Sequence, residues 1–434
     1  MTIRTTSTRV GSKLILLAAV TAIAACDGAA AAAPTSSESP QATASASPSM
    51  PVGPSYVPAP TPTSNPSPMP PPRHDPPKAQ AAKPTWSQPH RIFQGAWCAS
   101  YVAVIDGSSR YHVAAECGQR IRYATSTNGT TWKTATFKNP LHRFDVDPQI
   151  AVDGRTLYLA FTRLRPTDGG CGDDGLVDVG VFYRTRTLPS GNWSAPVQMG
   201  KAGDHLQSLR VVDGVIHETV ITNEEQGPVF YASQRGATHR RVLIKGAQQT
   251  SLRVGDDGRA RVAFTTEHSV KIATIGSGGR VSTHTVFAAT DVYMRSPVLV
   301  LGANDTAYLA WTATTWSGGG CTDGDYRSPH EGTWFATNAA GRWERKRLTP
   351  DATSASLAAD VASGQVHVLY SDRRGHRFVT RAADGAWSGS RLAAGLEMQG
   401  LILRYDPATG RFLVVGSLWR SGDSTEEIYA LVRR

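Results

Sequence analysis

The most regular feature of the chain is a short segment of alternating apolar and small or polar residues that returns about every 50 residues. Alternation with a period of two places successive side chains on opposite faces of a β-strand. The segment occurs seven times, at residues 110–116, 156–162, 215–221, 259–265, 306–312, 365–371 and 411–417. A strand that repeats at this spacing predicts seven copies of one β-unit.

Each copy follows another apolar segment and a tight turn. The turn sequences are Asp106-Gly107, Asp153-Gly154, Asp213-Gly214, Asp257-Gly258, Asn304-Asp305, Ser363-Gly364 and the stretch 406–410. Asp-Gly between two apolar runs favours a two-residue β-hairpin. A third strand follows, and then a Gly-containing turn, often with a Trp, introduces a fourth. The pattern predicts an all-β fold, a single β-propeller of seven four-stranded antiparallel blades, with six blades as the alternative.

The two ends of the predicted ring are expected to meet. The last copy, residues 399–434, has room for only three strands. Residues 90–93 (HRIF), which precede the first blade, are apolar enough to supply the fourth. Such pairing would join the ends of the chain and remove an exposed sheet edge.

The first 25 residues predict an export signal. Basic residues precede the apolar stretch 14–25, which is shorter than the roughly 20 residues that span a bilayer and has the length of a signal-peptide core. The stretch ends in IAAC at Cys26, which resembles the bacterial lipobox. The resemblance implies a lipoprotein signal peptide at 1–25 and a lipid on Cys26 that holds the exported chain at the outer face of the cytoplasmic membrane. An ordinary signal peptide with an incidental Cys is the alternative.

Residues 26–88 consist almost wholly of Ala, Pro, Ser and Thr, and 17 of the 27 prolines lie at or before Pro89. This composition buries too little apolar surface to offset the entropy lost on ordering. It predicts a disordered tether, extended in part as polyproline II, between the membrane and a propeller domain at 89–434. A ligand for Pro-binding domains is the alternative interpretation.

Charge and cysteine content agree with export. The formal net charge is +10 at pH 7, and three of these charges lie in the signal peptide. The remaining charge of about +7 is spread over the propeller rather than clustered, which suits anionic wall polymers or glycans and, in an exported chain, argues against nucleic acid. Cys98 and Cys117 are predicted at matching ends of adjacent strands in blade 1 and are expected to form a disulfide. Cys171 and Cys321 lie in Gly-rich insertions of blades 2 and 5, where their pairing would join two long loops.

No cofactor is expected, and a Ca²⁺ site in the Gly-rich insertions is the alternative. The same insertions contain acidic residues whose carboxylates suit Ca²⁺, although their spacing is not that of an EF-hand loop. These are Asp173, Asp174, Asp323 and Asp325. The metalloprotease, phosphate-loop, dinucleotide and nucleophile-elbow motifs are absent from the sequence.

The turn TSTNGTTW at residues 125–132 resembles the Asp box of bacterial neuraminidase (sialidase) repeats, Ser/Thr-x-Asp-x-Gly-x-Thr-Trp. Thr125, Gly129, Thr131 and Trp132 match the motif, and Thr127 stands where the Asp belongs. Weaker Gly-x-Trp relatives end at Trp193, Trp343 and Trp387. The resemblance covers the propeller and implies a structural turn between third and fourth strands, on the face opposite an active site.

Sialidases also share an active site. The resemblance implies an arginine triad that binds the substrate carboxylate through bidentate forks, a Tyr–Glu pair and an Asp acid/base. The weak catalytic candidates are Glu218, Asp291, Tyr293, Arg295 and Arg373. Other polar residues of the loops expected on the same face are Asp145, Asp147, Asp204, His205, Asp351, Glu397 and Gln399. The alternative is that these residues are ordinary polar side chains of solvent-exposed loops. The sequence does not identify the three arginines of a sialidase triad.

Glu218 departs from its own repeat. At this position the other six copies have Val or Leu, so the carboxyl group is expected at an interface between blades. Burying a carboxylate there is costly unless it is paired. The hypothesis is a buried, ion-paired Glu218 with Arg210 or Arg253 as partner, of functional or structural importance.

Together these patterns favour a monomeric, lipid-anchored surface protein whose propeller binds a glycan, a cell-wall polymer or a protein. The alternative is an exo-acting glycoside hydrolase of sialidase type. The interpretation leans away from an enzyme, because the resemblance to sialidases covers the propeller repeats, with seven predicted blades where canonical sialidases have six, and does not extend to an identified active site.

Overall fold

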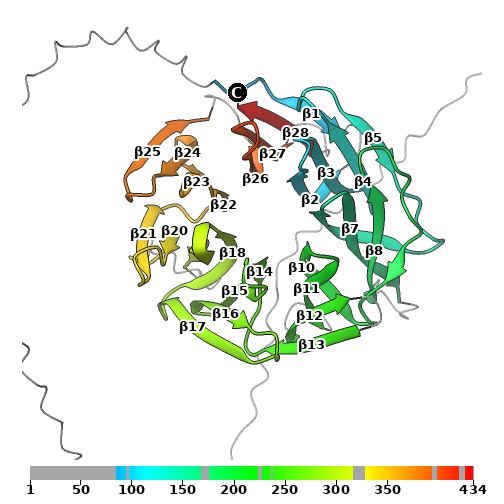
Figure 1. The fold of residues 1–434 in the computed structure, drawn as a ribbon, viewed down its shortest axis with the longest axis horizontal. Coiled ribbons are helices and arrows are strands. Elements are labelled where there is room, and N and C mark those ends of the chain that lie inside the picture. Colours follow the sequence, from blue (N-terminus) through cyan, green and yellow to red (C-terminus); the bar gives the residue numbers. More distant parts are fainter. Residues whose placement is uncertain are drawn as a thin grey trace, which may run out of the picture. The chain divides into compact units, whose positions relative to one another are not determined.

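The computed structural model describes residues 85–93, 97–167, 175–222, 227–235, 238–315, 328–392, 398–419 and 426–433, all within the unit that spans 79–434. These residues form seven four-stranded antiparallel sheets, arranged as blades around a common axis (Figure 1). The predicted seven-bladed propeller is therefore confirmed, and the six-bladed alternative is excluded. No helix in these ranges is long and apolar enough to cross a membrane.

In blades 1 to 6 the strands follow chain order from the innermost to the outermost. Blade 1 contains β2 (Cys98–Ile105), β3 (Tyr111–Cys117), β4 (Arg120–Ser126) and β5 (Lys133–Thr136). Blade 2 contains β6 (Phe144–Asp153), β7 (Thr156–Pro166), β8 (Leu176–Thr187) and β9 (Val197–Gln198). Blade 3 contains β10 (Asp204–Val212), β11 (Val215–Thr222), β12 (Val229–Arg235) and β13 (Thr238–Ile244).

The remaining blades repeat this plan. Blade 4 contains β14 (Thr250–Val254), β15 (Ala260–Thr266), β16 (Ser269–Ile275) and β17 (Val281–Ala288). Blade 5 contains β18 (Tyr293–Leu301), the 3-10 turn η1 (Ala303–Asp305), β19 (Ala307–Thr314), β20 (Gly332–Thr337) and β21 (Glu344–Thr349). Blade 6 contains β22 (Ala355–Asp360), β23 (Gln365–Asp372), β24 (Gly375–Arg381) and β25 (Trp387–Arg391).

Blade 7 joins the two ends of the described chain. It contains β26 (Met398–Asp406), β27 (Arg411–Trp419), β28 (Glu426–Arg433) and, as its outermost strand, β1 (His90–Phe93). His90 pairs with Ala430 and Arg91 with Tyr429. The predicted closure by residues 90–93 is confirmed. Trp86 extends the contact through an antiparallel bridge to Arg433.

The repeated segment supplies the second strand of each blade, and its central apolar residue is buried between blades. Six copies place a Val or Leu there with 0% exposure: Val113, Leu159, Val262, Leu309, Val368 and Val414. Each hydrophobic cluster spans two neighbouring blades, as where residues of β2 and β3 pack against residues of β27 and β28. The ring is thus held by sheet-to-sheet packing rather than by one central core.

The two faces of the ring carry different loops. The face that we call the junction face carries the loops that join one blade to the next and those between second and third strands. The opposite hairpin face carries the loops between first and second and between third and fourth strands. Gly154, Gly214 and Gly258 of the predicted Asp-Gly turns have φ of 52°, 72° and 71°, which explains the glycine at these positions.

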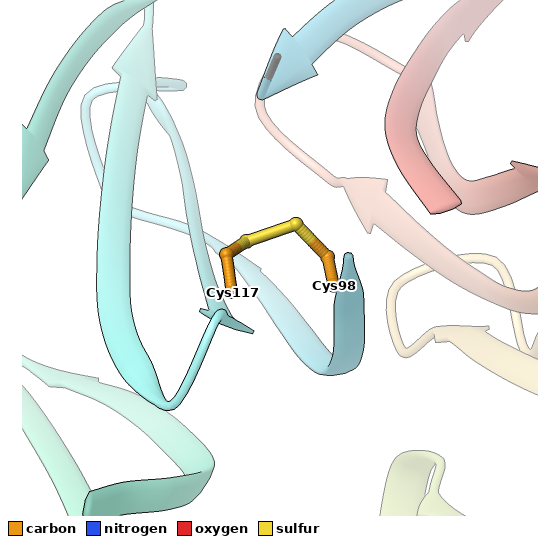
Figure 2. Close-up of a disulfide and its surroundings, with 2 residues drawn as sticks. All are labelled: Cys98 and Cys117. Atoms are coloured by element: carbon orange, nitrogen blue, oxygen red, sulfur yellow. A yellow bond between two sulfur atoms is a disulfide. The ribbon is translucent and has the colours of Figure 1, made fainter. Parts of the chain in front are cut away.

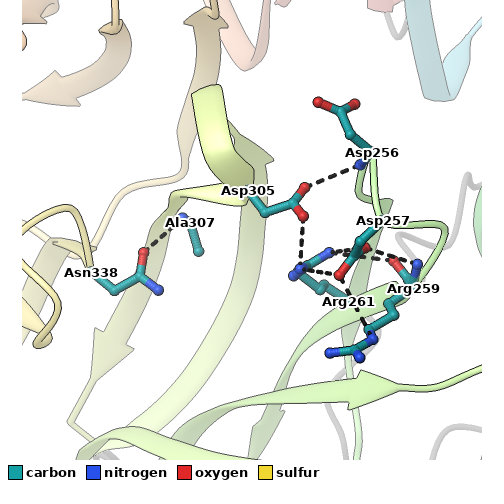
Figure 3. Close-up of polar contacts among 7 residues, drawn as sticks. All are labelled: Asp256, Asp257, Arg259, Arg261, Asp305, Ala307 and Asn338. Carbon is teal, nitrogen blue, oxygen red and sulfur yellow. Dashed lines mark hydrogen bonds and ion pairs between the residues drawn. The ribbon is translucent and has the colours of Figure 1, made fainter.

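Charged side chains tie blade 4 to blade 5 on the hairpin face (Figure 3). Asp305 of η1 accepts a hydrogen bond from the backbone N–H of Asp256 at 3.1 Å. Its other oxygen lies 3.0 Å from Arg261, which also pairs with Asp257 at 2.9 Å. These contacts join two neighbouring hairpins, so the acidic residues there serve the packing of the ring.

Candidate functional site

A pocket of about 390 Å³ lies on the junction face, where the innermost strands of blades 7, 1 and 2 begin. Its lining residues are Ala99, Ser100, Tyr101, Asp147, Pro148, Gln149, Gln399, Gly400, Ser417 and Glu426. The lining therefore offers hydroxyl, amide and carboxylate groups. Among the described residues, the lining includes two acidic side chains and no Lys or Arg.

Irregular strand pairing shapes this pocket. Three register shifts fall at the pocket end of the innermost strands, between Cys98 and Tyr101, between Val146 and Gln149, and between Gln399 and Ile402. Such bulges redirect side chains away from the regular alternation. Asp147 lies in the second bulge with φ of 48°, a left-handed conformation that costs a non-glycine residue roughly 1–3 kcal/mol. The fold thus holds this carboxylate in a strained conformation in the pocket wall.

Tyr101 joins blade 1 to blade 7 beside the pocket. Its hydroxyl donates to the carbonyl oxygens of Gln399, at 2.7 Å, and Gly400, at 2.8 Å, and accepts from the backbone N–H of Ser417 at 3.2 Å. Burial raises the pKa of Tyr101 to about 12. The phenol therefore stays protonated at neutral pH and acts as a hydrogen-bonding link between blades.

A disulfide between Cys98 and Cys117 braces the same end of blade 1 (Figure 2). Its presence agrees with the predicted pairing. Cys98 precedes the pocket residues Ala99 and Ser100, whereas Cys117 directly follows Glu116. The cross-link therefore fixes the two strand ends from which Ser100 and Glu116 project.

Next to the pocket, polar side chains of blades 1, 2 and 3 form a connected cluster. Asp147 accepts hydrogen bonds from Ser100 at 2.5 Å and from Nε2 of His205 at 2.8 Å. The other ring nitrogen of His205 lies 3.1 Å from Asp178. The backbone N–H of Asp147 donates to Glu116 at 3.4 Å. Asp147 is thus the link between the pocket and the cluster.

The ionisation states in this cluster differ from those of free side chains. Burial alone would lower the pKa of His205, but hydrogen bonds and charges of Asp147 and Asp178 raise it to about 9. Burial, reinforced by the charge of Asp147, raises the pKa of Glu116 to about 7. Although burial opposes it, hydrogen bonding by His205 and Ser100 lowers the pKa of Asp147. At neutral pH the cluster therefore contains an imidazolium, an ionised Asp147 and a partly protonated Glu116.

The cluster does not form a metal centre. Across the described ranges, no group of three or more His, Cys, Asp or Glu side chains is arranged to hold an ion. The Gly-rich insertions with Cys171, Cys321, Asp173, Asp174, Asp323 and Asp325 lie outside the described residues, as does Glu397. The second predicted disulfide and the Ca²⁺ site therefore stay predictions.

The weak catalytic candidates do not gather at this pocket. Asp291 accepts from Ser328 and lies 2.9 Å from His330, all in blade 5 or its entry loop. The ring of Tyr293 lies 5.2 Å from that of His268. Arg295 is exposed. Arg373 of blade 6 is exposed and pairs with Asp351 at 2.9 Å. Among the loop residues that the sequence analysis named, Asp147 and Gln399 line this pocket, and His205 lies beside it through its contact with Asp147.

Glu218 is buried, as predicted, with 4% exposure. Among the described residues, no basic side chain lies within ion-pair distance of it, and its Oε2 has no hydrogen-bond partner. Arg241, whose charge lowers the pKa of Glu218, pairs instead with Asp204 at 2.7 Å. Burial, together with the charge of Asp204, raises the pKa of Glu218 to about 8. The expected ion pair is thus replaced by a protonated carboxyl group, because neutralisation costs less than an unpaired buried charge.

Several site residues were missed by sequence reasoning. Ser100, Tyr101 and Glu426 lie at strand ends that look like ordinary β-segments, and Glu116 closes the repeated segment of blade 1. The only local signal was the position of Glu116 beside Cys117, a residue already expected in a disulfide. Convergence of strands from different blades is not visible in a linear pattern.

The Asp-box-like turn lies on the hairpin face, between β4 and β5. Asn128 Oδ1 accepts from the backbone N–H groups of Thr130 and Thr131, each at 2.9 Å. Trp132 Nε1 donates to the carbonyl of Gly129 at 3.2 Å. Asn128 therefore organises this turn, and the membership of the turn in the Asp-box family stays a prediction.

No protein-family model matches the chain, and no curated protein matches its sequence. Solved structures with a similar fold include Kuenenia stuttgartiensis hydrazine synthase, at 11% identity and TM-score 0.51 over 75% of this chain and 94% of that chain. A Dyadobacter fermentans protein of unknown function has 10% identity and TM-score 0.50 over 80% and 97%. Trypanosoma rangeli sialidase in complex with sialic acid has 11% identity and TM-score 0.46 over 81% of this chain and 59% of that chain. At such identities the likeness to the first two structures shows a common fold and nothing about activity.

Proposed function

We propose that this chain is a bacterial surface lipoprotein whose propeller binds a glycan through the junction-face pocket. The observation that carries the proposal is the lining, which combines hydroxyl, amide and carboxylate groups from three blades. A sugar presents donors and acceptors in several directions, and convergent polar groups on a rigid scaffold match that chemistry.

The acidic side chains in the pocket lining indicate which class of sugar the pocket would bind. Asp147 and Glu426 are acidic, and none of the described residues that line the pocket is Lys or Arg. A sugar carboxylate would meet repulsion here, whereas carboxylates accept hydrogen bonds readily from neutral hydroxyls or an ammonium group. The pocket therefore favours a neutral sugar or an amino sugar over a sialic acid.

Glycoside hydrolysis is the second candidate function. Glu116 and Asp147 are neighbouring acids whose pKa values shift in opposite directions, to about 7 for Glu116 and downward for Asp147. A protonated acid beside an ionised carboxylate is the arrangement used to cleave glycosidic bonds. Glu116 does not itself line the pocket, so we rank binding first.

Binding is tested with the purified full-length protein on neutral, amino-substituted and sialylated oligosaccharides, followed by calorimetric titration. We expect a neutral or amino sugar to bind and Asp147→Asn or Gln399→Ala to weaken it at least tenfold. Asp291→Asn is the matched control on the same face and should leave affinity unchanged. Retention only of sialylated ligands, or equal loss in the control, would contradict the proposal.

Turnover is tested separately with fluorogenic glycosides, including a sialoside. We expect no hydrolysis above the rate without protein. Turnover that disappears in Glu116→Gln would instead support the hydrolase, and activity should then fall as the pH rises through about 7, because the general acid must keep its proton. If the wild type hydrolyses none of the glycosides while Asp147→Asn weakens sugar binding, the binding proposal stands and the hydrolase is excluded.

Membrane anchoring is a proposal from the lipobox-like sequence at Cys26. Acyl chains contribute about 0.8 kcal/mol per buried CH₂, so a lipidated Cys26 would hold the chain on a membrane. Cys26→Ser should move the protein from the membrane pellet to the soluble exported fraction. An unchanged distribution would contradict lipid attachment at this residue.

A further inference from the structure

Three arginines occupy one equivalent position in the innermost strands of blades 3, 4 and 7. Each follows a buried Leu that pairs with the centre of the second strand: Leu209 with Glu218, Leu252 with Val262, and Leu403 with Val414. The arginines are Arg210, Arg253 and Arg404. The other four blades have small or apolar residues at this position, namely Val104, Ala151, Val300 and Ala358.

The three side chains make the same contact with the backbone. The Nη1 groups of Arg210, Arg253 and Arg404 donate to the carbonyls of the preceding Leu residues, at 2.6, 2.7 and 2.8 Å. Arg404 Nε also donates to the carbonyl of Ala103 in blade 1, at 2.6 Å. Within the described part of the chain, none of the three has a carboxylate within ion-pair distance. A guanidinium has five N–H donors in a fixed fork, so most of their hydrogen-bonding capacity is not used by these contacts.

The ring brings these charges toward one another. In a closed ring of seven, blade 7 lies opposite the pair formed by blades 3 and 4, and Figure 1 shows β10, β14 and β26 around the axis. All three side chains are half-buried. Burial, followed by the charge of Arg404, lowers the pKa of Arg210 to about 9. The charge of Arg404 in blade 7 thus acts on Arg210 in blade 3.

Half-buried guanidinium groups without a carboxylate partner attract an anion. The local dielectric constant is low, and an anion relieves the repulsion between the positive charges. We propose that Arg210, Arg253 and Arg404 form a binding site on the propeller axis for a small oxyanion of the phosphate or sulfate class. Guanidinium forks match the paired oxygens of such anions.

This site is separate from the glycan pocket. Arg404 follows the pocket residue Gly400 by four residues on β26, about 13 Å along a strand at roughly 3.3 Å per residue. The anion is either free in solution or a substituent of a larger ligand. The proposal does not depend on glycan binding, and the two can fail independently.

The test uses full-length protein, with inorganic phosphate and glucose 6-phosphate as probes against chloride at constant ionic strength. We expect phosphate to raise the melting temperature in a saturable way, and calorimetry to give a dissociation constant that Arg404→Gln weakens at least tenfold. Stabilisation by both probes would indicate a free-anion site. Stabilisation by glucose 6-phosphate alone would indicate a site for an anionic group on a larger molecule.

Arg411→Gln is the matched control, since this exposed arginine lies on the neighbouring strand of blade 7 and should bind phosphate as the wild type does. If Arg404→Gln does not fold, Arg253→Gln gives the same test in another blade. The proposal is overturned if neither probe stabilises the wild type, or if the arginine variants and the control respond alike.

Discussion

At the scale of single residues, the molecule places acids and bases where their ordinary ionisation changes. Glu218 keeps its proton because it is buried and, among the residues that the structure describes, no basic side chain lies within ion-pair distance of it. His205 gains charge because it lies between two carboxylates. The two residues are in the same blade, yet their pKa values rise to about 8 and about 9 for opposite electrostatic reasons. Each therefore predicts a distinct dependence of folding stability on pH.

For Glu218, the folded pKa of about 8 lies above the reference value of 4.5. Between these values the folded state binds a proton that the unfolded chain has lost, so the free energy of unfolding falls as the pH rises from about 4.5 to 8. Glu218→Gln should remove about 2–4 kcal/mol of this pH dependence, measured by denaturant unfolding from pH 4.5 to 8.5. The exposed Glu344→Gln should retain the wild-type slope. An unchanged slope in Glu218→Gln would show that the carboxyl group is ionised when folded.

For His205, the folded pKa of about 9 lies above the reference value of 6.5. Its stabilisation is therefore complete below about pH 6.5 and is lost as the pH rises through 9. His205→Gln should lower the free energy of unfolding by about 1–3 kcal/mol at pH 6 and by much less at pH 9.5, in the same unfolding assay. The exposed His284→Gln is the control. An equal decrease in the free energy of unfolding at both pH values would mean that His205 stabilises the protein by packing and not by its charge.

At the scale of elements, the pocket depends on how the starts of the innermost strands meet. Gly400 has φ of 58°, and a Cβ added there would lie 2.3 Å from the Tyr101 hydroxyl. The glycine thus permits both the backbone conformation and the link between blades 7 and 1. The bulges in β2, β6 and β26 interrupt the regular alternation at this same place.

Gly400→Ala should therefore destabilise the protein by about 2–4 kcal/mol, since it adds a clash to the cost of a left-handed alanine. Gly410→Ala is the matched control, because Gly410 also has a positive φ, of 68°, but no atom lies within 4 Å of the added Cβ. We expect the control to cost only about 1 kcal/mol. Thermal and denaturant unfolding measure both, and equal losses would contradict the steric role of Tyr101.

At the scale of the whole molecule, the ring is closed by non-covalent pairing of its two ends. β1 supplies Ile92 and Phe93, with 6% and 3% exposure, to the cluster between blades 7 and 1. The ring of Trp86 lies 5.5 Å from that of Phe378 in blade 6. The short segment before blade 1 therefore contacts the last two blades and covers an edge of β28.

A chain that begins at residue 97 should lose this closure, exposing apolar surface and an unpaired edge that favours association. We expect it to elute as aggregates and to lack a cooperative melting transition. A chain that begins at residue 79 is the control and should remain monomeric with a sharp transition. Size-exclusion chromatography and circular dichroism make the comparison, and equal behaviour of the two chains would show that closure is dispensable.

Much of the architecture was predictable because it depends on residue patterns that extend over only a few positions. The period-two segments, the Asp-Gly turns and the position of HRIF at residues 90–93 need only strand and turn chemistry. The disulfide of Cys98 and Cys117 followed from the expected topology. The pocket was not predictable in the same way, since Ser100, Asp147 and Gln399 come from three blades and are directed by bulges that carry no sequence signature.

Local sequence patterns are enough to predict a repeating antiparallel β-architecture, its closure and one inter-blade anomaly at Glu218, because hydrophobic period and turn residues act over a few positions. The three-dimensional structure was needed to show that Glu218 is buried without the expected ion pair, that Asp147 and His205 meet beside a pocket, and that three arginines occupy equivalent positions in the innermost strands. Those outcomes depend on distances between blades, and so on the closed ring rather than on any one segment of it.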